Sequence, residues 1–100
     1  MIQACEALAD PIRAEIVERL ARGDLTAGEI AGGFAVSRPA VSRHLRVLRE
    51  CGLVTYEPHA QQRVYRLNRQ PLHELNTWIA GRLDALGDHL DDMARQRRGR

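Results

Sequence analysis

The sequence VSRPAVSRHLRVLRECG, residues 36–52, alternates arginines with aliphatic residues at the spacing of an amphipathic helix. Ser37 is a typical N-cap residue, the proline after it is tolerated in the first turn, and Gly52 is typical of the position just beyond a helix C-terminus. The stretch therefore predicts a helix at 37–51 with one core-facing side and one cationic side. At about 100° per residue, the core-facing residues are Val41, Leu45 and Leu48.

Three more helices are expected before this stretch. Asp10-Pro11 pairs an N-cap residue with proline at the first helical position, and the apolar spacing that follows predicts a helix from about 11 to 22. The sequence TAGE at 26–29 has the form of a capping box and opens a short helix that ends at Gly32-Gly33. A further short helix is predicted at 2–9, with an inner face formed by Ile2, Cys5, Leu8 and Ala9.

A small β-hairpin is expected after the arginine-rich helix. Short runs rich in Val, Thr and Tyr occur at 53–56 and 63–67, with a polar tip at 58–62 between them. Two strands alone are marginally stable, so this hairpin must pack against the helices. The sequence thus predicts a mainly α fold with a small two-stranded β-wing at 53–67.

The last third of the chain predicts one long helix that mediates dimerisation. Pro71 starts an apolar pattern with successive spacings of 3, 4, 4, 3, 4 and 3 residues, which is a heptad seam. Such a helix is about 40 Å long, more than a small domain can cover, so the helices at about 2–9 and 71–96 are expected to form a homodimer. The predicted interface residues are Leu72, Leu75, Ile79, Leu83, Leu86 and Leu90, and the same seam reaches Met93.

Length and composition fit one domain. One hundred residues with 44% hydrophobic content predict a single domain at 1–97 and a disordered tail at 98–100. Gly81 and Gly87 disfavour helix, which leaves open whether the last helix is continuous. The segment 36–70 carries a net charge of +5, whereas the 35 residues before it carry −3. All 15 cations are arginines, whose guanidinium forks suit phosphates and guanine edges.

Several protein classes are disfavoured. No apolar run approaches the ~20 residues of a bilayer span, and the first ten residues carry two acids and no cation, so a cytoplasmic protein without a secretory signal is expected. Cys5 and Cys51 lie in no CxxC or CxC pair; reduced, partly buried thiols are expected, and no metal or other cofactor. No nucleophile–base pair or phosphate-binding glycine loop occurs, so no catalytic residue and no enzyme is predicted.

A short capped helix, a glycine-containing turn and a second capped helix are the pattern of a helix-turn-helix, whose second helix enters the major groove of DNA. We expect Arg38 and Arg43 to read bases, Arg46 and Arg63 to anchor the DNA backbone, and His44 to make a structural hydrogen bond. The residues predicted to contact double-stranded DNA are Ser37, Arg38, Pro39, Ser42, Arg43 and Arg46 on the helix and Gln62 and Arg63 on the wing.

Five consecutive blocks of the sequence resemble the small ArsR-type winged helix-turn-helix repressors of prokaryotes, and in particular their compact, metal-independent, autorepressor-like branch. The blocks are ALADPIRAEIVERL (7–20), LTAGEIA (25–31), SRPAVSRHLRVLRECGLV (37–54), QRVYRLN (62–68) and PLHELNTWI (71–79). The resemblance implies a homodimeric repressor that binds a palindromic operator through the helix at 37–51 and the wing at 53–67. By the same resemblance, the base-facing positions are Arg38, Pro39, Ser42 and Arg43.

Departures from the resemblance limit the metal-sensing functions. Metal-sensing relatives carry a C-x-C where this chain has Thr26-Ala27-Gly28, and Asp88-His89 and Asp91-Asp92 are adjacent pairs that do not face one ion on a helix. Two alternatives stay open. One is a redox or metal sensor of the same fold that uses Cys5 and Cys51 and responds to an unknown small-molecule or protein effector; the other is a winged helix that binds an acidic protein partner.

Overall fold

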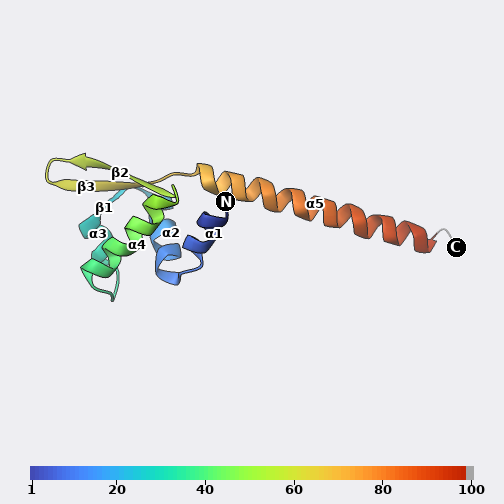
Figure 1. The fold of residues 1–100 in the computed structure, drawn as a ribbon, viewed down its shortest axis with the longest axis horizontal. Coiled ribbons are helices and arrows are strands. Elements are labelled where there is room, and N and C mark those ends of the chain that lie inside the picture. Colours follow the sequence, from blue (N-terminus) through green and yellow to red (C-terminus); the bar gives the residue numbers. More distant parts are fainter. Residues whose placement is uncertain (99–100) are drawn as a thin grey trace.

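The computed structural model describes residues 1–98, and the side chains of residues 1–95. A helical body with a small sheet occupies one end, and the last helix projects from it as a long arm (Figure 1). In chain order the elements are α1 (Ile2–Leu8), α2 (Pro11–Arg22), β1 (Leu25–Thr26), α3 (Ala27–Gly32), α4 (Arg38–Glu50), β2 (Val54–His59), β3 (Gln62–Leu67) and α5 (Gln70–Arg98).

The helices of the body begin at the caps that the sequence predicted. The Asp10 carboxylate accepts hydrogen bonds from the second and third amides of α2 at 2.8 and 3.0 Å. Thr26 and Glu29 form the reciprocal capping box of α3, and the Ser37 hydroxyl accepts from the third amide of α4 at 3.3 Å. Gly52 follows α4 with φ +81°, a left-handed conformation that glycine adopts without strain.

The predicted wing is present, and it belongs to a three-stranded antiparallel sheet with the order β1-β3-β2. The third strand, β1, was not predicted because two residues are too few for a periodic pattern. The expected polar tip at 58–62 is shorter than predicted: Pro58 pairs with Arg63, and the turn is only Ala60 and Gln61. Because β2 is an edge strand, a proline without an amide proton fits there.

The core lies where α1, α2, α3 and α4 meet the sheet. The predicted core side of α4 is confirmed, since Val41, Leu45 and Leu48 are at most 2% exposed. The predicted inner face of α1 is wrong: its buried residues are alanines, whereas Ile2 is 71% exposed and Cys5 is also exposed. α1 packs against both α2 and α4, and its buried positions hold only methyl side chains, Ala4 and Ala7.

The arm is one continuous helix of 29 residues, so neither Gly81 nor Gly87 ends it. Leu72 packs against the core of the body, but the seam beyond Leu75 is exposed, from 41% at Met93 to 61% at Leu83. Arg98, where the predicted tail begins, is still helical, and residues 99–100 lie outside the described residues. Within the described chain, no helix is both long and apolar enough to cross a membrane.

Candidate nucleic-acid interface

The outer face of α4 presents the predicted DNA-binding residues to solvent. Ser37 at the N-cap and five residues of the helix are all exposed, while the opposite side of the same helix is buried. The five are Arg38, Pro39, Ser42, Arg43 and Arg46. Burial of the aliphatic side therefore fixes which way the arginine side points.

The turn between α3 and α4 is held by Arg19 of α2. Its guanidinium lies 4.3 Å from the centre of the Phe34 ring and donates a hydrogen bond to the carbonyl oxygen of Gly33 at 2.9 Å. Glu15 accepts from the same side chain at 3.2 Å, which orients it. A side chain at Gly33 would overlap the guanidinium. These contacts tie α2 to the turn that precedes α4, and they involve residues with no periodic relation in the sequence.

The first turn of α4 and the wing tip border one depression of about 290 Å³. It brings together Arg38 of α4 and Arg63 of β3, two arginines from separate elements. The Arg38 side chain lies over α3: its Nη2 atom is 3.3 Å from the position that a Cβ atom on Gly28 would occupy. The lining residues are Thr26, Ala27, Gly28, Arg38, Gln61, Gln62 and Arg63. Two guanidiniums at one concave surface suit a phosphate better than a neutral group.

Tyr56 of β2 connects the wing to α4. The guanidinium carbons of Arg49 and Arg63 each lie 4.7 Å from the centre of its ring, and the Tyr65 ring lies 5.5 Å away. Arg63, the arginine predicted to contact DNA from the wing, is thus oriented by stacking on the Tyr56 ring of the neighbouring strand. Sequence reasoning assigned Tyr56 only to a strand, because its contacts with Arg49 and Arg63 depend on the strand register and on the docking of α4.

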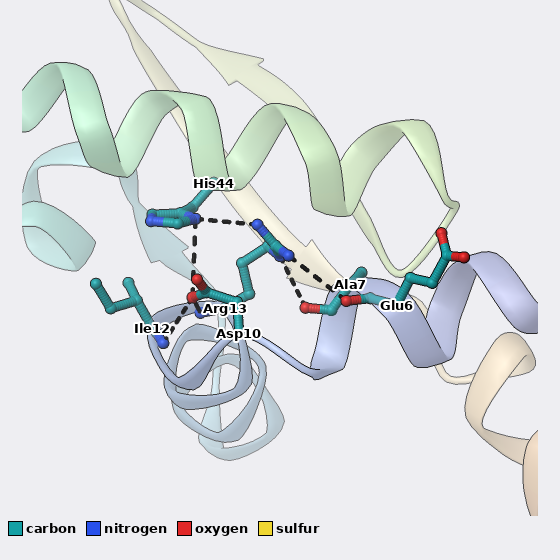
Figure 2. Close-up of polar contacts among 6 residues, drawn as sticks. All are labelled: Glu6, Ala7, Asp10, Ile12, Arg13 and His44. Carbon is teal, nitrogen blue, oxygen red and sulfur yellow. Dashed lines mark hydrogen bonds and ion pairs between the residues drawn. The ribbon is translucent and has the colours of Figure 1, made fainter.

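Arg46 and His44 have different surroundings although they are neighbours on α4. The Arg46 guanidinium pairs with Glu50 at 3.1 Å in an exposed ion pair, with both side chains at least 65% exposed. Such a pair is weak and exchanges readily for a phosphate. His44 instead faces α2, where its Nδ1 atom lies 3.4 Å from Arg13 Nη1 and 3.9 Å from Asp10 Oδ1 (Figure 2). This agrees with the structural role expected for His44.

The cysteines do not form a ligand site in the described chain. Cys5 is exposed on α1, contrary to the expected partial burial, and Cys51 is half-buried with its thiol directed to the carbonyl oxygen of Leu48 at 3.3 Å. No group of three or more His, Cys, Asp or Glu residues within the described part could hold a metal ion. The adjacent pairs Asp88-His89 and Asp91-Asp92, which were not expected to hold a metal, lie on the exposed arm.

A capped α3, a held turn, an α4 with an outward arginine face and a β-wing docked beside it define a winged helix-turn-helix protein. Comparison with known proteins agrees. The bacterial regulatory protein family described as the arsR family matches residues 10–56. The chain therefore has both the fold and the sequence signature of one group of regulators.

The relatives that match most of the chain have regulatory names. The HTH-type transcriptional regulator Rv2034 of Mycobacterium tuberculosis is 51% identical over 75% of this chain and 70% of its own length. The transcriptional repressor SdpR of Bacillus subtilis is 35% identical over 74% and 82%. The solved structure of an ArsR-like transcriptional regulator from Rhodococcus sp. RHA1 matches with a TM-score of 0.79 at 30% identity, over 95% of this chain and 86% of that one. This chain belongs to the ArsR family and is a DNA-binding transcriptional regulator, not an enzyme.

Proposed function

We propose that the protein is a homodimeric repressor that binds a palindromic operator with two copies of α4 and its wing. The observation that carries the proposal is the exposed arginine face of α4, which its buried opposite side holds outward. A second helix of this kind enters the major groove, where guanidiniums reach guanine O6 and N7. The relative SdpR carries the name of repressor. We place this function in the cytoplasm.

Within this proposal the arginines divide by position. Arg43, in the middle of the exposed face, reads base edges together with Ser42 and Pro39, while Arg46 and Gln62 contact the DNA backbone. Arg38 was expected to read bases, but its guanidinium lies over α3 at the depression shared with the wing. We therefore assign Arg38 and Arg63 to one backbone phosphate, and we expect Ser37 to contact the same DNA strand.

The dimer in this proposal forms through α5 with help from α1. Beyond Leu75 the arm exposes a continuous apolar stripe, which a soluble helix does not keep in water without a partner. The stripe consists of Ile79, Leu83, Leu86, Leu90 and Met93. The predicted interface residues Leu72 and Leu75 are partly buried where α5 leaves the body. A two-fold axis through this helix would present two α4 helices about 34 Å apart, one turn of DNA.

Selection of bound sites from random double-stranded DNA by the purified protein tests the proposal. Two half-sites related by a dyad, about one helical turn apart, are expected. With the selected operator, Arg43→Ala should cost about 1–3 kcal/mol and relax the preference at one base position. Arg46→Ala should weaken operator and random DNA equally and lower the salt dependence.

Three results would contradict the proposal. Recovered sites without symmetry would exclude the palindromic operator, and an unchanged operator preference in Arg43→Ala would exclude its base contact. A protein that shows no preference for any DNA sequence at moderate salt would instead support the alternative of a winged helix that binds an acidic protein.

A further inference from the structure

Arg13 of α2 joins two helices that do not follow one another in the chain. Its Nε atom donates a hydrogen bond to the carbonyl oxygen of Ala7 at 2.7 Å, and its Nη2 atom donates to that of Glu6 at 3.5 Å. Both carbonyls belong to the last turn of α1, and that of Glu6 also accepts from the amide of Ala9 at 3.2 Å. Its Nη1 atom reaches His44 of α4, so one guanidinium spans from α1 to α4 (Figure 2).

The contact with His44 has a defined direction. A guanidinium carries only donors, so in this 3.4 Å contact His44 Nδ1 is the acceptor. Asp10 lies too far from the same nitrogen, at 3.9 Å, for a hydrogen bond, and its Oδ1 atom already accepts from the amides of Ile12 and Arg13. Arg13 therefore makes the directional contact from α2 to the middle of α4.

The remaining contacts of α4 are mostly apolar. Val41, Leu45 and Leu48 hold the helix against the body and determine which side of it is buried, but the hydrophobic effect has no directional preference of its own. The hydrogen bond to His44 depends on angle and resists a small rotation about the helix axis. His44 stands one residue after Arg43 and two before Arg46, so its direction also sets theirs.

We propose that Arg13 is a positioning residue for operator recognition: by joining the end of α1 to His44, it fixes the rotation of α4 and hence the direction of Arg43. The inference rests on the proposed function and deepens it, because it names what orients the reading helix. Without this contact the arginines remain on the surface. Binding to random DNA is then retained, while the preference for the operator falls.

The experiment compares the affinity of each variant for the selected operator and for a random duplex of equal length, by fluorescence anisotropy at one salt concentration. Arg13→Met keeps the length of the side chain and removes its donors, and His44→Leu removes the acceptor. Each should lower the ratio of operator to random affinity about tenfold, with random binding within twofold of the parent. Arg22→Met, which removes a charge from an exposed position of the same helix, is the matched control and should leave the ratio unchanged.

Two further variants separate positioning from general structural support. His44→Asn places an amide oxygen near the former Nδ1 and should retain the ratio within about threefold. The double variant Arg13→Met/His44→Leu should lose no more than Arg13→Met alone, because both substitutions remove the contact between these two side chains. Thermal unfolding and sedimentation confirm that every variant is folded and has the parent's assembly state at the assay temperature. If Arg13→Met does not fold, the His44→Leu and His44→Asn pair decides.

The results distinguish failure of this inference from failure of the proposed function. A parent protein without operator preference overturns the proposed function, and this inference with it. A parent with clear preference, together with an unchanged ratio in Arg13→Met and His44→Leu, overturns the inference alone. Equal losses on operator and random DNA, or losses that multiply in the double variant, also overturn it, because they indicate a general loss of structure.

Discussion

The body and the arm of this molecule differ in how far their apolar side chains are buried. In the body, most large aliphatic side chains of α2, α3 and α4 are buried, and Ile16, Ile30 and Leu48 are at 0% exposure, although Val47 is 38% exposed. In the arm, leucines at the same helical spacing remain more than half exposed, as at Leu83 and Leu90. The body therefore contains its own stabilising core, whereas the arm depends on a surface that a single chain does not supply.

The largest effect is expected from a charge on the exposed seam. Leu86→Glu should weaken the proposed dimer by roughly 3–6 kcal/mol, or 10²- to 10⁴-fold, because each dimer loses two buried leucines. Operator affinity should fall with it, while the body keeps its fold. Sedimentation equilibrium measures the effect, and the fluorescence of Trp78, the only tryptophan, reports on the arm.

The control for this variant lies on the opposite face of the same helix. Thr77→Glu adds an equal charge at an exposed position away from the seam and should leave the assembly unchanged. If Leu86→Glu remains a dimer at the concentrations at which the parent does, the exposed seam of α5 is not the dimer interface, and the arm does not depend on a partner in the way proposed.

A leucine deletion in each region sharpens the same contrast. Leu48→Ala should lower the free energy of unfolding of the body by about 2–5 kcal/mol, since it leaves a cavity at a fully buried site. Leu90→Ala, at a site 55% exposed, should change the unfolding of the dilute monomer by less than about 0.5 kcal/mol. Urea unfolding followed by circular dichroism measures both. Equal losses would mean that the arm packs within one chain.

Glycine-to-alanine changes should have opposite signs in the two regions. A methyl group at Gly33 overlaps the Arg19 guanidinium and displaces it from Phe34, so Gly33→Ala should destabilise the body by about 1 kcal/mol. Gly81 has open space around it, and Gly81→Ala should stabilise the helical arm by about 1 kcal/mol. Thermal unfolding of both variants tests this. A stabilised Gly33→Ala would show that Arg19 does not hold the turn.

The smallest effect is expected from the capping carboxylates of the body in acid. The amide of Arg13 and then that of Ile12 hold the pKa of Asp10 below its usual value. The folded state thus favours the charged carboxylate, so this stabilisation is present at neutral pH and is lost as the pH falls through the lowered pKa. Asp10→Asn keeps an acceptor but does not titrate, and should flatten the acid limb of melting temperature against pH. Glu18→Gln, an exposed acid on α2, is the control, and an unchanged limb in Asp10→Asn contradicts the expectation.

Local signals predicted most of the fold correctly. The starts of α2, α3 and α4 follow from Asp10, Thr26 and Ser37, because a capping hydrogen bond involves only residues two or three apart. The predicted inner face of α1 was wrong because a helix of seven residues is too short for its spacing to specify one apolar face. The close approach of α2 and α4 selects the alanines as the buried residues.

The candidate interface was predicted in part. The exposed residues of α4 follow from helical periodicity, since the buried side determines the other. The convergence of Arg38 with Arg63, the stacking of Arg49 and Arg63 on Tyr56, and the contact of Arg13 with His44 join residues from separate elements. Periodicity within one element carries no information on such contacts.

The sequence alone determined the helices and their ends, the two-sided character of α4, the wing and the apolar seam of α5, because caps, turns and amphipathic spacing act over a few neighbouring residues. The tertiary structure decided which alanines of α1 are buried, where the guanidinium of Arg38 lies and what holds α4 in its rotation. Those outcomes depend on how close the packed elements approach one another, and that distance is set by side chains far apart in the chain.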